Sequence, residues 1–146
     1  MAKKIIRNKT QLRQAYMEAI KKVVEEMRNR VYETLNYFLQ EYYDSYDPVS
    51  YRRTKDFLYS AVKTDVQIDG NKAIAFVYID TESMDNYYNA TGYQVASWAN
   101  EGLHGGKDLG NGTPHVWDDT MKETIVNGEL LRLAKEYLRK EGFKVR

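Results

Sequence analysis

The chain has 146 residues, no cysteine and a formal net charge of +1, because 22 Lys and Arg nearly balance 21 Asp and Glu. This length suits one α+β domain over residues 1–146 with its own core. The lack of cysteine excludes disulfides and thiolate catalysis, and the balanced charge gives no reason to expect nucleic acid or a membrane surface as the main ligand. No segment has the roughly 20 apolar residues of a membrane span or the apolar stretch of a secretory signal.

The first predicted element is a long amphipathic helix over about residues 10–43. Apolar residues recur there at helical spacing, and the segment contains neither Pro nor Gly. Such a helix would be about 50 Å long, whereas a compact chain of this size is about 40 Å across. We therefore expect it to project, bend or break near Asn29, and a projecting helix would use Leu35 and Phe38 to contact other subunits.

A β-hairpin is predicted over about residues 62–79, after a turn at 44–50 and one or two helical turns within 55–62. Apolar and polar residues alternate from Val62 to Ile68, β-forming residues follow from Ala73 to Ile79, and the turn-forming sequence Asp69-Gly70-Asn71 separates them. The charged residues Lys63 and Asp65 are expected to be exposed, which indicates a sheet covered on one side only.

The remaining elements are predicted in chain order as follows: a polar loop at 81–92, a third strand or short bridging element at 93–100, a Gly-rich loop at 101–114, a helical region over about 117–141, and an edge strand at 143–145. The Gly-rich loop holds five glycines and is expected to have little persistent structure. The predicted fold is α+β, with the long N-terminal helix and a C-terminal helix packed on a small antiparallel sheet that contains the hairpin.

One group of residues has the side-chain types of a metal or acid–base site. Its members are Glu101, His104, Asp108, His115, Asp118 and Asp119. A small metal-dependent hydrolase or nuclease using His104, His115 and nearby carboxylates is therefore an alternative function. No spacing places these ligands on one helical face, and flexible glycines separate the two histidines, so the sequence favours a chain without catalytic residues, metal or cofactor.

Tyrosine and arginine are the residues most suggestive of binding. Thirteen tyrosines are many for this length, and several lie beside turn residues; Tyr and Arg are enriched in protein interfaces. The Tyr51-Arg52-Arg53 segment leaves three alternatives open: a salt link to the acidic end of the long helix, a protein interface, or a nucleic-acid contact.

Several short motifs resemble those of the small head-to-tail joining, neck and tail-completion proteins of tailed bacteriophages. They are Arg53-Thr54 followed by Leu58, Ser60 and Ala61, the segment from Trp98 to Gly102, and a last helix that begins after Pro114-His115-Val116-Trp117. The resemblance covers most of the chain and implies a structural protein of the virion neck or tail, made in the cytoplasm of the bacterial host.

The resemblance further implies a ring-shaped homo-oligomer that contacts portal, connector or tail subunits, with DNA at most passing through its lumen and no membrane partner. No catalytic residue would be carried over. The residues expected at protein interfaces are Leu35, Phe38, Tyr51, Arg52, Arg53, Tyr87, Tyr88, Trp98 and Trp117.

Overall fold

The computed structural model describes residues 5–45, 56–84, 91–104, 107–110 and 112–146. Its longest element is α1 (Lys9–Asp44), a helix of 36 residues that spans about 54 Å. Asn8 caps it, because its Oδ1 accepts a hydrogen bond from the Gln11 N–H at 2.9 Å. The long helix is thus confirmed, and the alternative of two helices separated near Asn29 is not observed.

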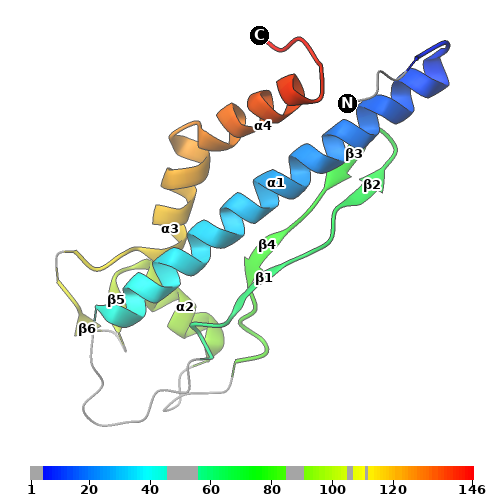
Figure 1. Cartoon of the computed structure of the whole chain (residues 1–146). Helices are drawn as coiled ribbons and strands as arrows, with labels where there is room; N and C mark the ends of the chain where they lie inside the picture. Colours follow the sequence, from blue (N-terminus) through cyan, green and yellow to red (C-terminus); the bar gives the residue numbers. More distant parts are fainter. Residues whose placement is uncertain (1–4, 46–55, 85–90, 105–106, 111) are drawn as a thin grey trace.

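The molecule is elongated along α1, with a β-ribbon on one side and the C-terminal helices on the other (Figure 1). The C-terminal layer comprises α3 (Val116–Met121), the π-helical turn η1 (Lys122–Val126) and α4 (Glu129–Lys140). Helix α2 (Gly92–Asn100) and the short strands β5 (Leu103–His104) and β6 (Lys107–Asp108) lie near the C-terminal end of α1. This arrangement confirms the predicted α+β class.

The ribbon is the predicted hairpin, divided into two paired sections. Strand β1 (Ala61–Lys63) pairs antiparallel with β4 (Val77–Ile79), and β2 (Gln67–Asp69) pairs with β3 (Lys72–Ile74). The turn falls between Asp69 and Lys72, as predicted from the sequence.

A β-bulge separates the two sections of the ribbon. Thr64 pairs with Phe76 through two hydrogen bonds, and the next pair is Gln67 with Ile74. Asp65 and Val66 on the first strand therefore face a single residue on the second, which disrupts and twists the first strand. Arg28 of α1 holds this bulge, since its Nη1 donates to the Thr64 carbonyl oxygen at 2.9 Å.

The main hydrophobic core lies at the C-terminal part of α1, where the ribbon, α2 and α3 converge. Its buried members are Leu35, Leu39, Tyr42, Tyr43, Phe57, Leu58, Ala61, Met84, Ala99 and Val116. The Tyr42 hydroxyl group donates to the Leu103 carbonyl oxygen at 2.7 Å and so ties β5 to this core. The N-terminal part of α1 buries less, with Ala19 and Val23 as its buried residues.

Four local predictions are wrong. Residues 92–100 form the helix α2, where a third strand or a short bridging element was expected at 93–100, because Thr91 and Gln94 cap it reciprocally. The described part of 55–62 is a turn leading into β1, and residues 143–145 form no strand. The Gly-rich loop also has structure of its own, since β5 pairs with β6.

Candidate functional site

The most distinctive surface feature is a row of apolar side chains along the second strand of the ribbon. Ile74, Phe76 and Tyr78 have exposed fractions of 37%, 63% and 44%, and we call these three residues the ribbon stripe. Large apolar side chains that are contiguous and exposed indicate a surface for another protein.

The ribbon stripe faces away from α1 because side chains alternate along a strand. Val77 and Ile79 pack against the core, and Ala73 and Ala75 are half-buried. The residues between them therefore point to the opposite face. Val62 lies opposite Tyr78 in the β1–β4 pair, so it extends the same outer face.

The charged residues of the first strand are exposed as predicted, but Lys63 does not belong to the outer face. It lies opposite Val77, on the side of the ribbon that α1 covers. Its Nζ lies 3.2 Å from the Asn29 Oδ1 and 4.8 Å from the centre of the Tyr32 ring. The aliphatic stem thus runs along α1, while the ammonium group remains accessible to water.

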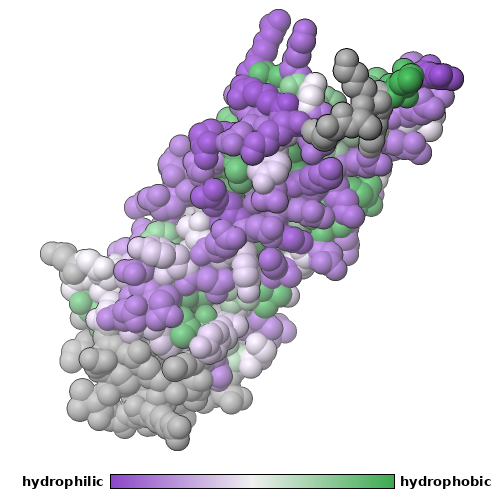
Figure 2. Space-filling view, viewed as in Figure 1, coloured by the Kyte–Doolittle hydropathy of each residue, from purple (hydrophilic) through white to green (hydrophobic). Residues whose placement is uncertain are grey.

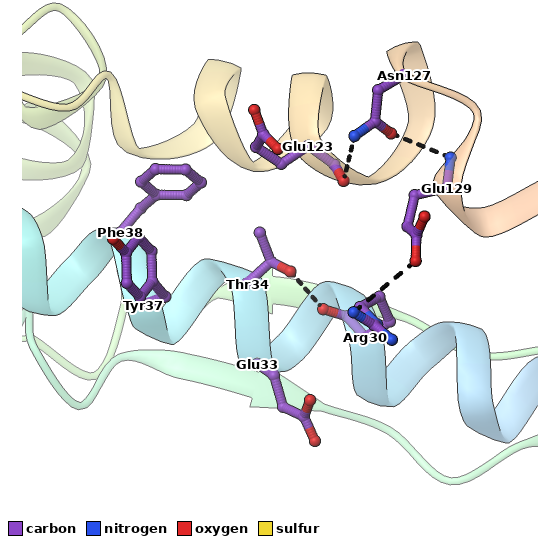
Figure 3. A pocket seen from close by; sticks show the side chains of 8 residues that line it. All are labelled: Arg30, Glu33, Thr34, Tyr37, Phe38, Glu123, Asn127 and Glu129. Carbon is purple, nitrogen blue, oxygen red and sulfur yellow. Dashed lines mark hydrogen bonds and ion pairs between the residues drawn. The ribbon is translucent and has the colours of Figure 1, made fainter. Parts of the chain in front are cut away.

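A second feature is an open groove between α1 and the η1–α4 segment, with a volume of about 630 Å³. Figure 3 shows its lining: Arg30, Glu33, Thr34, Tyr37, Phe38, Glu123, Asn127 and Glu129. Several of its polar groups are paired within the chain: Arg30 lies 3.8 Å from Glu129, and Asn127 bonds both the Glu123 carbonyl oxygen and the Glu129 N–H. This pairing favours a structural role for the groove over ligand binding.

The carboxylate of Glu129 is held by two arginines. Arg132 donates to it through Nε and Nη2 at 3.0 and 2.7 Å, and these hydrogen bonds lower the pKa of Glu129; the charges of Arg132 and Arg30 act in the same direction, against partial desolvation. Because the folded-state pKa is lowered, the contribution of Glu129 to stability is present above its unfolded-state pKa and is lost as the pH falls through the folded-state pKa.

His115, a candidate in the hydrolase alternative, lies at the junction between α2 and α3. Its Nδ1 lies 2.9 Å from the Asn100 carbonyl oxygen, and since that oxygen only accepts, Nδ1 carries the hydrogen. The Asn100 Oδ1 in turn accepts from the N–H groups of Trp117 and Asp118 at 3.0 and 2.8 Å. These bonds cap the first turn of α3 and connect the two helices.

Within the described part of the chain, no group of three His, Asp or Glu side chains has the arrangement of a metal site. His104 and Asp108 lie in β5 and β6, but their side chains fall outside the described structure. Of the two histidines in the alternative hypothesis, His115 has a described side chain, and its Nδ1 is bonded to the Asn100 carbonyl oxygen.

The structure corrects one predicted interface residue. Leu35 is fully buried, with an exposed fraction of 0%, and packs in the chain's own core. Phe38 and Trp117 are half-buried against that core, and Trp98 is also half-buried. Tyr51, Arg52, Arg53, Tyr87 and Tyr88 lie outside the described residues.

Sequence reasoning missed the ribbon stripe, although the sequence contains its signal. From Lys72 to Ile79, every second residue is exposed in the structure, and the exposed positions after Lys72 are apolar. The segment as a whole is so apolar that its periodicity does not reveal which face is covered. Figure 2 shows, by contrast, a largely hydrophilic face along α1 and α4.

Comparison with known proteins places the chain in a family. The YomN family model matches residues 8–140, so the chain belongs to the YomN family, which is phage-derived. No curated protein and no solved structure matches the chain. None of the described helices is both long and apolar enough to cross a membrane.

Proposed function

We propose that this member of the YomN family is a structural assembly protein of a phage virion, which associates with copies of itself into a closed ring at the head-to-tail junction. The ring would contact portal, connector or tail proteins, and its role would be non-enzymatic. The phage origin of the family and the motifs that resemble neck and tail-completion proteins support this assignment.

The ribbon stripe is the observation that carries the proposal. Phe76 is 63% exposed and lies between Ile74 and Tyr78 on one face of a two-stranded ribbon. A two-stranded ribbon with an uncovered apolar face is poorly protected by its own chain. Contact with other subunits would remove this apolar surface from water.

The shape of the molecule supports the same role. Helix α1 is about 54 Å long, and the main core surrounds only its C-terminal part. The N-terminal part carries exposed Leu12 and Tyr16. An elongated subunit of this kind can contact a neighbour at both ends, as a closed ring requires.

The native mass of the purified chain tests the proposal. We expect native mass spectrometry to detect a closed assembly with a fixed number of copies, which persists on dilution through the micromolar range. Negative-stain images of the same sample should show rings. A chain that remains monomeric over this range, alone and with its co-expressed structural neighbours, would contradict the proposed function.

A further inference from the structure

We propose that two copies of the chain pair through the outer edge of the β3–β4 strand, so that two ribbons join into one four-stranded antiparallel sheet. The inference deepens the proposed function, on which it rests, by identifying the partner of the ribbon as a second copy of the same chain. The inference follows from a difference between the two edges of the ribbon, since the first strand is protected against pairing with another chain and the second strand is not.

The first strand is protected against pairing with another chain. It contains the bulge at Asp65 and Val66, and the Thr64 carbonyl oxygen accepts a hydrogen bond from Arg28. The strand also carries the charged residues Lys63 and Asp69. Bulges and charged residues are the features by which proteins prevent edge strands from pairing.

Between Lys72 and Asp80, the second strand lacks all of these features. Residues 73–79 have the sequence Ala-Ile-Ala-Phe-Val-Tyr-Ile, with no charge, no proline and no bulge. In the described residues this strand has one strand neighbour, since each described sheet has two strands. An uncharged edge of seven residues, five of which are β-forming, is a strong template for another strand.

The main-chain groups of this strand point in the direction that pairing requires. Phe76 bonds Thr64 through both its N–H and its carbonyl oxygen, and the Asp80 N–H bonds the Ser60 carbonyl oxygen. Alternate residues of an antiparallel strand direct their polar groups to opposite edges. Val77 and Ile79 therefore direct theirs to the outer edge.

The sequence of the strand is complementary to itself in one register. With Phe76 on a two-fold axis, Phe76 faces its own copy, Ile74 faces Tyr78, and Lys72 faces Asp80. Each apolar residue meets an apolar residue on the same face, and the two ends form opposite-charge pairs. Lys72 is exposed and Asp80 is half-buried, so both belong to the surface of the single chain.

The joined sheet is compatible with the position of α1. Helix α1 covers one face of each ribbon, and strands are spaced about 4.8 Å apart. Four strands therefore provide about 20 Å of width for two helices that are each about 10 Å in diameter. The two ribbon stripes then lie side by side on the opposite face.

Because this contact is isologous, a closed ring built on it contains an even number of copies.

Single-cysteine variants test the register, because the natural chain has no cysteine. In the proposed pair the two Phe76 Cα atoms are about 4.5 Å apart, which lies within the range of a disulfide. The two Ile74 Cα atoms would be roughly 14 Å apart at about 3.4 Å per residue. We expect Phe76→Cys to cross-link into covalent dimers under mild oxidation, and Ile74→Cys to cross-link at least tenfold less.

A charge exchange tests the same register without removing an aromatic side chain. Lys72→Glu places like charges opposite each other and should weaken dimerisation about tenfold. The double variant Lys72→Glu/Asp80→Lys should restore it. Each replacement alone also affects its own chain, because Lys72 lies opposite Asp69 in the hairpin and Asp80 accepts a hydrogen bond from the Ser83 N–H. Restoration by the double variant is therefore the result that is specific to the pair between copies.

The outcomes separate this inference from the proposed function. Equal cross-linking of the two cysteine variants, failure of the double variant to restore pairing, or rings with an odd number of copies would overturn the edge pairing while leaving ring assembly intact. Cross-linked dimers that never form larger assemblies would uphold the edge pairing and contradict the ring.

Discussion

Leu35→Glu is expected to unfold the chain rather than only to separate subunits. The Leu35 side chain is fully buried beside Leu39 and Tyr42, and a carboxylate placed there without a partner costs several kcal/mol. That cost is comparable with the roughly 5–15 kcal/mol total stability of a domain. Circular dichroism during thermal and urea denaturation measures the loss of folding stability.

Tyr37→Glu provides the matched control for this prediction. Tyr37 is two residues away on the same helix and is 59% exposed, so its variant should retain the melting temperature of the natural chain within a few degrees. If Leu35→Glu instead remains folded and only loses association, Leu35 belongs to a subunit interface and the assignment of the core is wrong.

Phe76→Glu is expected to have the opposite effect, with normal folding and loss of self-association. The side chain lies on the outer face of the ribbon, so a carboxylate there remains in water in the single chain. In the assembly it would face the carboxylate of its own copy at the centre of the contact, where the like-charge pair out of water, added to the loss of the aromatic side chain, weakens association about a hundredfold or more. On the same sample, sedimentation velocity measures self-association and circular dichroism measures folding.

The control is Tyr93→Glu, which places the same charge on α2 at a side chain that is 72% exposed. This variant should assemble as the natural chain does. If Phe76→Glu associates normally, the ribbon stripe is not an assembly surface, and the proposed function loses its main support.

The elements with strong local signals could be predicted from the sequence. The spacing of apolar residues in 10–43 sufficed for α1, and Asp69-Gly70-Asn71 sufficed to locate the turn of the hairpin. These features depend on residues close together in the chain. The C-terminal helical region was predicted for the same reason, and it agrees with α3, η1 and α4.

Helix α2 was missed although its signal is present. Thr91 and Gln94 form a capping box, and Ala96 and Ala99 favour a helix. The aromatic and β-branched residues Tyr93, Val95 and Trp98 suggested a strand instead. Here the reciprocal hydrogen bonds at the start of the segment outweigh the β-propensity of its side chains.

The location of the candidate site depended on tertiary structure. Helical periodicity indicates that Leu35 lies on an apolar face, but not whether that face packs within the chain or against another subunit. Similarly, the hairpin pattern does not determine which face α1 covers. The bulge at Asp65 and Val66 shifts the register by one residue, a change that no short motif announces.

The location of the chain in purified virions tests the central claim most directly. A small epitope tag at the C-terminus, followed by gold labelling and electron microscopy, would show where the protein resides in particles of the phage that encodes it. We predict gold at the joint between head and tail, with several labels on one site in accordance with a ring. Virions that contain no labelled chain, or labels distributed along the tail or over the head, would contradict the account.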